Sequence, residues 1–185
     1  MAKAKGTTLI SLVKFLRSHA GGAREHLSPE LHGYLETRIQ TALWYPEEDV
    51  LALLRCMVEL VPAARQTALA QMGVRLAQEH LEGVYEHLRG GVEDLNSLHR
   101  RSYALWSTMH DSGKLSVRSE GPDSAHFELR DYALPSPEMC SILTAYFTET
   151  LRLSGAVEPE VEETSCRLQG AGHCGWQAHW RGPSS

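Results

Sequence analysis

Three of the four cysteines and one glutamate lie at intervals that suit a metal site. Glu163 and Cys166 are three residues apart, Cys174 follows eight residues after Cys166, and Cys140 lies 23 residues before the glutamate. Thiolate sulfur suits zinc, and a site with four protein ligands leaves no coordination position open for a substrate. The spacing therefore predicts a structural zinc bound by Cys140, Glu163, Cys166 and Cys174.

The same residues allow other interpretations. The sequence lacks the paired Cys-x-x-Cys motifs that mark a strong zinc site, and a free cysteine is often a small buried apolar residue. His173 is adjacent to Cys174 and could replace Glu163 as the fourth ligand, because imidazole is the commoner zinc donor. A disulfide between Cys166 and Cys174 is a further alternative, which a reducing compartment disfavours. Cys56 lies in an apolar segment and is predicted to be a core residue.

The segment around the glutamate indicates how the ligands come together. Gly170 and Gly172 allow a tight reversal between the last two cysteines, because glycine adopts positive φ without steric cost. Val161 and Glu163 have the same parity, so an uninterrupted strand would turn the carboxylate toward the apolar side, where it needs a partner. Cys166 has the opposite parity, so we expect the strand to end or bulge before it.

Composition indicates one globular domain. The chain has 185 residues, of which 42% are hydrophobic and 22% charged, with a net charge of -5. A negative chain without a basic cluster argues against a nucleic-acid surface. The first residues are not followed by the apolar region of a signal peptide, and no apolar run is long enough to span a bilayer. We therefore expect a cytoplasmic protein.

Apolar residues recur at helical spacing through most of the first 113 residues. The helices that this pattern predicts lie at 7–19, 28–39, 47–61, 62–88 and 92–109. The helix at 47–61 is apolar nearly all round, which is typical of a central helix.

The periodicity changes to alternation after residue 113. It predicts a hairpin over 115–130, a helix opened by Ser136-Pro137, and two final strands, the second with Cys174, Trp176, Ala178 and Trp180 on one face. We expect an α+β fold: a four-stranded antiparallel sheet with about five to six helices packed mainly on one face. Residues 1–185 form one domain in this interpretation, mainly helical over 6–113, with the hairpin-helix-hairpin part and its cysteine signature over 114–181.

The signature Glu163-x2-Cys166-x3-Gly170-x3-Cys174 resembles that of the 4-vinyl-reductase domain. The resemblance implies a zinc ion bound as in the transcription activators that contain this domain, by an upstream cysteine and by the glutamate and two cysteines of the signature. The whole chain is similar to a paralogous family expanded in myxobacteria, through Trp44-Tyr45-Pro46, Gly83-Val84-Tyr85, the segment 113–117, Gly155-Ala156 and the segment 162–166. The wider superfamily includes TRAPP vesicle-transport subunits and the haem nitric-oxide-binding domain.

The resemblance favours a non-enzymatic regulatory or sensory domain that binds a small apolar ligand between helices and sheet. Aromatic residues that could line such a pocket are Tyr85, Tyr103, Trp106, Phe127 and Tyr146, although aromatic residues at helical spacing usually belong to the core.

The alternative is a protein-interaction adaptor or homodimer, with Trp44 and Tyr45 as interface residues. Two functions rank lower. A haem-binding sensor would use a histidine as axial ligand, and the sequence offers His80, His87, His99 and His110. An enzyme lacks support because no catalytic, phosphate-binding or dinucleotide motif is present in the sequence.

Overall fold

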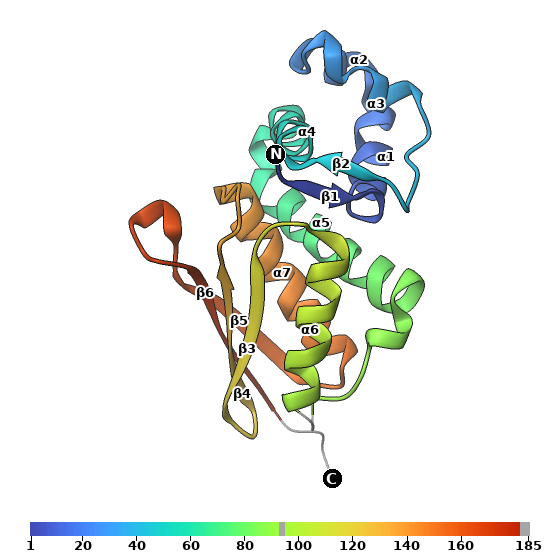
Figure 1. Ribbon diagram of the computed structural model, residues 1–185. Coiled ribbons are helices and arrows are strands. Elements are labelled where there is room, and N and C mark those ends of the chain that lie inside the picture. Colours follow the sequence, from blue (N-terminus) through green and yellow to red (C-terminus); the bar gives the residue numbers. More distant parts are fainter. Residues whose placement is uncertain (93–94, 182–185) are drawn as a thin grey trace.

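The computed structural model describes residues 1–92 and 95–181 (Figure 1). Helices occupy most of the chain up to Met109, and the four long strands come after it. In the described ranges, no helix is both long and apolar enough to cross a membrane.

The N-terminal part combines short helices with a small antiparallel sheet. Its strands are β1 (Lys3–Lys5) and β2 (Trp44–Pro46). Between them lie the 3-10 turn η1 (Gly6–Thr8), α1 (Ile10–Ser18), α2 (Ala20–His26), the 3-10 turn η2 (Pro29–Leu31) and α3 (Gly33–Glu36). In Figure 1 this part lies at the end of the molecule, above the long sheet.

Longer helices follow β2. Helix α4 (Glu47–Leu60) begins with three acidic residues, whose negative charge is favourable at the positive end of the helix dipole. After the 3-10 turn η3 (Pro62–Ala64), α5 (Arg65–Glu79) continues into one π-helical turn, η4 (His80–Val84), and a 3-10 turn, η5 (Glu86–Leu88). Helix α6 (Leu95–Met109) then leads to the sheet.

The main sheet is antiparallel throughout, with the strand order β3-β4-β6-β5. Its strands are β3 (Lys114–Gly121), β4 (Ser124–Arg130), β5 (Val157–Ser165) and β6 (Cys174–Arg181), with the 3-10 turn η6 (Arg167–Gln169) before β6. Helix α7 (Pro137–Leu153) connects the two hairpins, and the amide of Met139 donates a hydrogen bond of 3.1 Å to the capping hydroxyl of Ser136. Figure 1 shows α6 and α7 on one side of the sheet.

The core lies between the sheet and these helices. The inward side chains of β6 are Cys174, Trp176, Ala178 and Trp180, all buried as predicted. Phe127 of β4 stacks on Phe147 of α7, with ring centroids 4.5 Å apart. Helices α5 and α7 approach closely at Gly73, where a Cβ atom would lie 2.3 Å from the carbonyl oxygen of Ile142.

The structure confirms the predicted fold class and differs from the prediction in local detail. The first predicted helix, at 7–19, is followed directly by α2, which was not predicted, and the predicted helix at 28–39 is reduced to a 3-10 turn and α3. The helix predicted at 62–88 ends at Glu79, and the small sheet of β1 and β2 was not predicted. Three-residue strands are too short to show a clear alternation. Residues 93 and 94 of the predicted helix at 92–109 lie outside the described residues.

Candidate functional site

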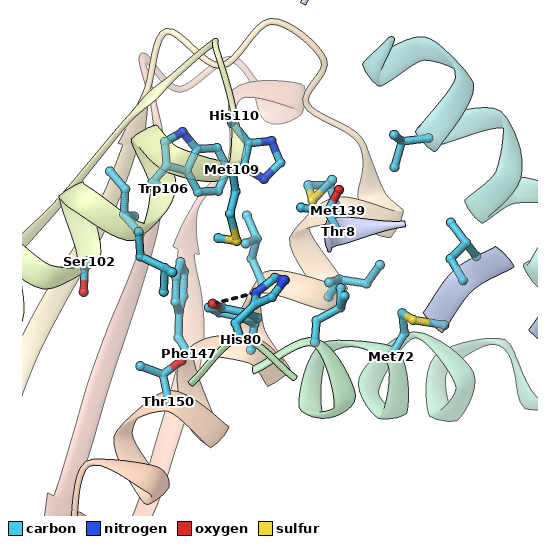
Figure 2. A pocket seen from close by; sticks show the side chains of 18 of the residues that line it. Thr8, Met72, His80, Ser102, Trp106, Met109, His110, Met139, Phe147 and Thr150 are labelled. Carbon is cyan, nitrogen blue, oxygen red and sulfur yellow. Dashed lines mark hydrogen bonds between the residues drawn. The ribbon is translucent and has the colours of Figure 1, made fainter. Parts of the chain in front are cut away.

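An interior cavity of about 60 Å³ lies where the helices meet the inner side of the sheet (Figure 2). Its walls come from η1, α1, α4, α5, η4, α6, β3 and α7. Most of the lining side chains are aliphatic, methionine or aromatic, and the polar ones are Thr8, His80, Ser102, His110 and Thr150. No lysine, arginine, aspartate or glutamate is among the described residues that line it. The cavity therefore suits an uncharged and mainly apolar occupant.

His80 lies in the middle of this lining, as Figure 2 shows. It is the first residue of the π-helical turn, in which the amide of Tyr85 donates a hydrogen bond to the carbonyl of His80, five residues earlier. Single π turns are frequent at functional sites. The chain is kinked within this turn, directly after α5, and the imidazole of His80 forms part of the cavity wall there.

The two ring nitrogens of His80 differ in their partners. Nδ1 lies 3.2 Å from the hydroxyl of Tyr146, which is the dashed line in Figure 2. Nε2 is buried and has no hydrogen-bond partner. Burial lowers the pKa of His80 to about 4. The backbone of Thr7 lies near the ring as a weak hydrogen-bond acceptor outside normal geometry, and it raises the pKa by a smaller amount. At neutral pH the ring is therefore uncharged.

The second histidine of the lining, His110, is already engaged. Its Nδ1 lies 2.7 Å from a carboxylate oxygen of the buried Glu47, and its ring stacks on Trp106 at 4.2 Å between centroids. The hydroxyl of Ser112 donates to the other oxygen of Glu47 at 3.3 Å. Burial and Glu47 together hold the pKa of Tyr132 well above its usual value. These bonds join the end of α6 to the start of α4.

The structure divides the aromatic residues that were predicted to line a pocket. Trp106 and Tyr146 line the cavity. Phe127 does not line it but is fully buried and stacks on Phe147, which does. Tyr85 packs edge-on against His80, with its hydroxyl 3.3 Å from that of Thr7. Tyr103 is 49% exposed and does not line the cavity.

The remaining candidate histidines lie elsewhere. His87 is exposed on η5, and Nδ1 of His99 accepts a hydrogen bond from the amide of Val117 at 3.0 Å. From the sequence, His80 was predicted only as one of several candidate haem ligands. The methionines and Phe147 of the cavity wall were not predicted, because nothing in a helical repeat distinguishes a cavity wall from an ordinary core.

The structure brings the four predicted metal ligands together near the first turn of α7. One donor atom from each of Cys140, Glu163, Cys166 and Cys174 lies within 4.8 Å of the others, and the sulfurs of Cys140 and Cys166 are 4.0 Å apart. The three cysteines are buried and Glu163 is exposed. Burial, and then Glu163, raise the pKa of the Cys140 thiol.

The strand irregularity that this convergence needs is present. The register of β5 against β6 shifts between Glu163 and Ser165, as expected for a bulge before Cys166. Gly170 ends η6 with a φ of 89°, so the reversal uses the conformation that glycine permits.

The structure contains neither of the two alternatives, a cluster with His173 as ligand or a disulfide between Cys166 and Cys174. His173 lies beside Glu128, with 3.4 Å between its Nε2 and a carboxylate oxygen, and it is not part of the cysteine cluster. Cys166 and Cys174 are free thiols, and so is Cys56, which is buried in α4 as predicted.

Comparison with known proteins supports the fold. No protein-family model and no curated protein sequence matches the chain. Among solved structures, it is similar to an H-NOX protein described in a study of H-NOX activation, with a TM-score of 0.69, 15% identity and 98% of each chain covered. It is also similar to a mutant of the T. tengcongensis H-NOX (TM-score 0.68, 15% identity, 98% of this chain and 100% of the other) and to the Fe(II) unliganded H-NOX from K. algicida (0.65, 12%, 98% of each).

These matches correct the cofactor prediction. Matched H-NOX structures are described by their heme distortion, by porphyrin distortion and by Fe(II). The cofactor of these neighbours is haem, and the prediction of a structural zinc as cofactor was wrong. The predicted likeness to the haem nitric-oxide-binding superfamily is confirmed at the level of the fold. The finer resemblances, to the 4-vinyl-reductase domain, TRAPP subunits and the myxobacterial paralogues, are not confirmed.

The cavity of this chain does not fit a haem. Nε2 of His80 has the chemistry of an axial ligand. However, a cavity of about 60 Å³ is smaller than the roughly 150 Å³ cavity that binds one benzene ring, whereas a porphyrin has four pyrrole rings. None of the described lining residues is a lysine or arginine that could pair with the propionates. The chain thus has the H-NOX fold around a cavity of different capacity.

Proposed function

We propose that this chain is a non-enzymatic regulatory or sensory domain that binds a small, uncharged and mainly apolar molecule in the interior cavity, with His80 as its polar anchor. The observation that supports this most directly is the buried His80, whose ring lines the cavity and whose Nε2 lacks a hydrogen bond of normal geometry. The H-NOX proteins that share the fold bind haem, and here a smaller molecule takes the corresponding role.

The free nitrogen supplies part of the binding energy. A buried polar group without a hydrogen bond costs about 1–3 kcal/mol. A ligand with one hydroxyl would remove this cost whichever tautomer His80 adopts, because a hydroxyl both donates and accepts. The rest of the affinity would come from contact with the apolar walls. Since the described lining has no charged side chain, an ionised ligand would lose its hydration without compensation.

The position of the cavity supports a regulatory role. Thr8 of η1 and Leu12 of α1 belong to the N-terminal part, whereas Leu115 and Phe147 belong to the part that contains the sheet. A ligand that contacts both parts binds more tightly to one arrangement of them than to another, and it shifts their equilibrium by that difference in affinity.

A titration with small alcohols tests the proposal. Propan-1-ol should produce saturable changes in the NMR spectrum of the wild-type protein, at residues of the cavity wall, whereas propionate and propylammonium should not. The variant His80→Leu should lose at least about 1 kcal/mol of binding free energy, roughly fivefold in affinity. His87→Leu, at an exposed histidine that does not line the cavity, is the matched control. Equal affinity in the His80 variant, or no saturable binding by the wild type, would contradict the proposal.

The cysteine cluster is a second proposed site. The convergence of Cys140, Glu163, Cys166 and Cys174 within 4.8 Å supports their assignment as ligands of a metal ion. Element analysis of the native protein, repeated with Cys166→Ser, tests the assignment without presuming which metal is bound. Equal metal content in the two proteins would contradict it.

Self-association remains the alternative function. Trp44 is 40% exposed, with the ammonium of Lys5 4.3 Å from its ring centroid, and large aromatic residues are common at the centre of interfaces. A mass measurement across protein concentrations tests it, and a monomer at all concentrations would exclude a homodimer.

A further inference from the structure

A second group of potential metal ligands lies on the outer face of the sheet, independent of the cavity. In β4, Ala125, Phe127 and Leu129 are buried, so His126 and Glu128 project from the opposite face, two residues apart. His173 directly precedes β6, whose first residues pair with the end of β4. One donor atom from each of His126, Glu128 and His173 lies within 4.8 Å of the others.

Gly175 makes room for this arrangement. It lies opposite Glu128 in the pairing of β4 with β6. A Cβ atom at Gly175 would lie 3.0 Å from Nε2 of His126 and 2.7 Å from the hydroxyl of Ser165. The imidazole of His126 therefore lies over the backbone of β6, at a position that a larger residue would obstruct.

The neighbours of the three residues leave their donor atoms oriented for a cation. Nδ1 of His126 lies 3.3 Å from the amide oxygen of Gln177. Because that oxygen only accepts, Nδ1 holds the proton and Nε2 has the free lone pair, the usual arrangement for a metal-binding histidine. Arg130 donates to one oxygen of Glu128. The other oxygen of Glu128 lies 3.4 Å from Nε2 of His173.

The chemistry of the group suits a transition metal. Two imidazoles and one carboxylate are nitrogen and oxygen ligands that favour zinc, copper, nickel, cobalt or iron over magnesium and calcium. Tetrahedral ligands with bonds of 2.0–2.2 Å are about 3.4 Å apart, which is the separation already present between His173 and Glu128. A donor atom of His126 lies within 4.8 Å of both.

The geometry points to a surface site for a divalent transition-metal ion, bound by Nε2 of His126, a carboxylate oxygen of Glu128 and Nε2 of His173. Three protein ligands leave at least one coordination position for water or another ligand. The inward Cys174 and the outward His126 belong to opposite faces of the sheet, so this site is separate from the cysteine cluster.

Cobalt(II) titration of the full chain tests this site and separates it from the cysteines. Metal at the cysteine cluster would give thiolate-to-cobalt charge-transfer absorption. Metal at the proposed site would broaden the imidazole NMR signals of His126 and His173 without this absorption, and His126 is the more specific reporter because it lies on the opposite face of the sheet from Cys174. We expect this broadening to saturate at one equivalent per site.

Substitution of the proposed ligands tests whether these residues bind the cobalt. Glu128→Gln preserves the shape of the side chain, and His173→Ala removes one imidazole. Each should weaken the cobalt binding that broadens His126 by at least about tenfold. His87→Ala, at an exposed histidine remote from the sheet in sequence, should leave it unchanged. Broadening that persists unchanged in both ligand variants, or cobalt bound only with thiolate absorption, would overturn the inference.

Discussion

Acid should destabilise the protein specifically through His80. The pKa of this histidine is lowered by burial from 6.5 to about 4 in the folded chain. Because the unfolded chain binds the proton more tightly, the free energy of unfolding is highest above pH 6.5 and falls as the pH decreases from 6.5 toward 4. Each factor of ten in proton affinity is worth about 1.4 kcal/mol. The loss that this one group causes should therefore reach about 3 kcal/mol at pH 4.

Urea unfolding at several pH values between 7.5 and 4 measures this loss. Other groups also titrate in this range, so the informative quantity is the difference between the wild type and His80→Leu. That difference should change by up to about 1.4 kcal/mol per pH unit below pH 6.5. His87→Leu, which removes an exposed histidine, should follow the wild type. Parallel curves for the wild type and His80→Leu would refute a neutral, buried His80 in the cavity wall.

Three further predictions concern the cavity and the cysteines. His80→Leu and Tyr146→Phe each leave the other residue of the pair without its partner, whereas the double variant removes both. In urea unfolding the double variant should be less destabilised than the sum of the single variants by about 1 kcal/mol, and additive effects would contradict this. Added haem should produce no spectrum of a histidine-ligated haem, and a stoichiometric Soret band that is lost in His80→Leu would show that the cavity opens far enough to bind it. If the cysteine cluster binds metal, Cys166→Ser should lower the metal content and the melting temperature together, since metal binding contributes to folding free energy, and a change in only one of them would contradict the coupling.

Periodicity was sufficient for the main elements of the fold. The acidic start at Glu47 and the Ser136-Pro137 cap placed α4 and α7 to within a residue or two, because capping and dipole effects act locally. Alternation identified the four long strands and the buried face of β6. The sequence did not reveal α2 or the end of α5, because two glycines in α2 disfavour a helix and no proline marks the π turn at His80.

The cysteine cluster could be predicted from the sequence, whereas the cavity could not. The cysteine cluster was predictable because its ligands have a distinctive chemistry and three of them are close in sequence. The cavity was not, because its walls come from helices and a strand far apart in the chain, and its volume depends on how their side chains pack. His80 and Tyr146 are 66 residues apart, and no local pattern distinguishes a histidine with a free nitrogen from one that is fully hydrogen-bonded.

The ¹⁵N chemical shift of His80 Nε2 during a titration with propan-1-ol is the most direct test of the account. If the cavity binds a small molecule through this nitrogen, its signal should move in a saturable way toward a hydrogen-bonded value, with smaller changes at the exposed His87. A signal of His80 Nε2 that stays constant while propan-1-ol binds elsewhere, or that already has the shift of a hydrogen-bonded nitrogen in the free protein, would contradict it.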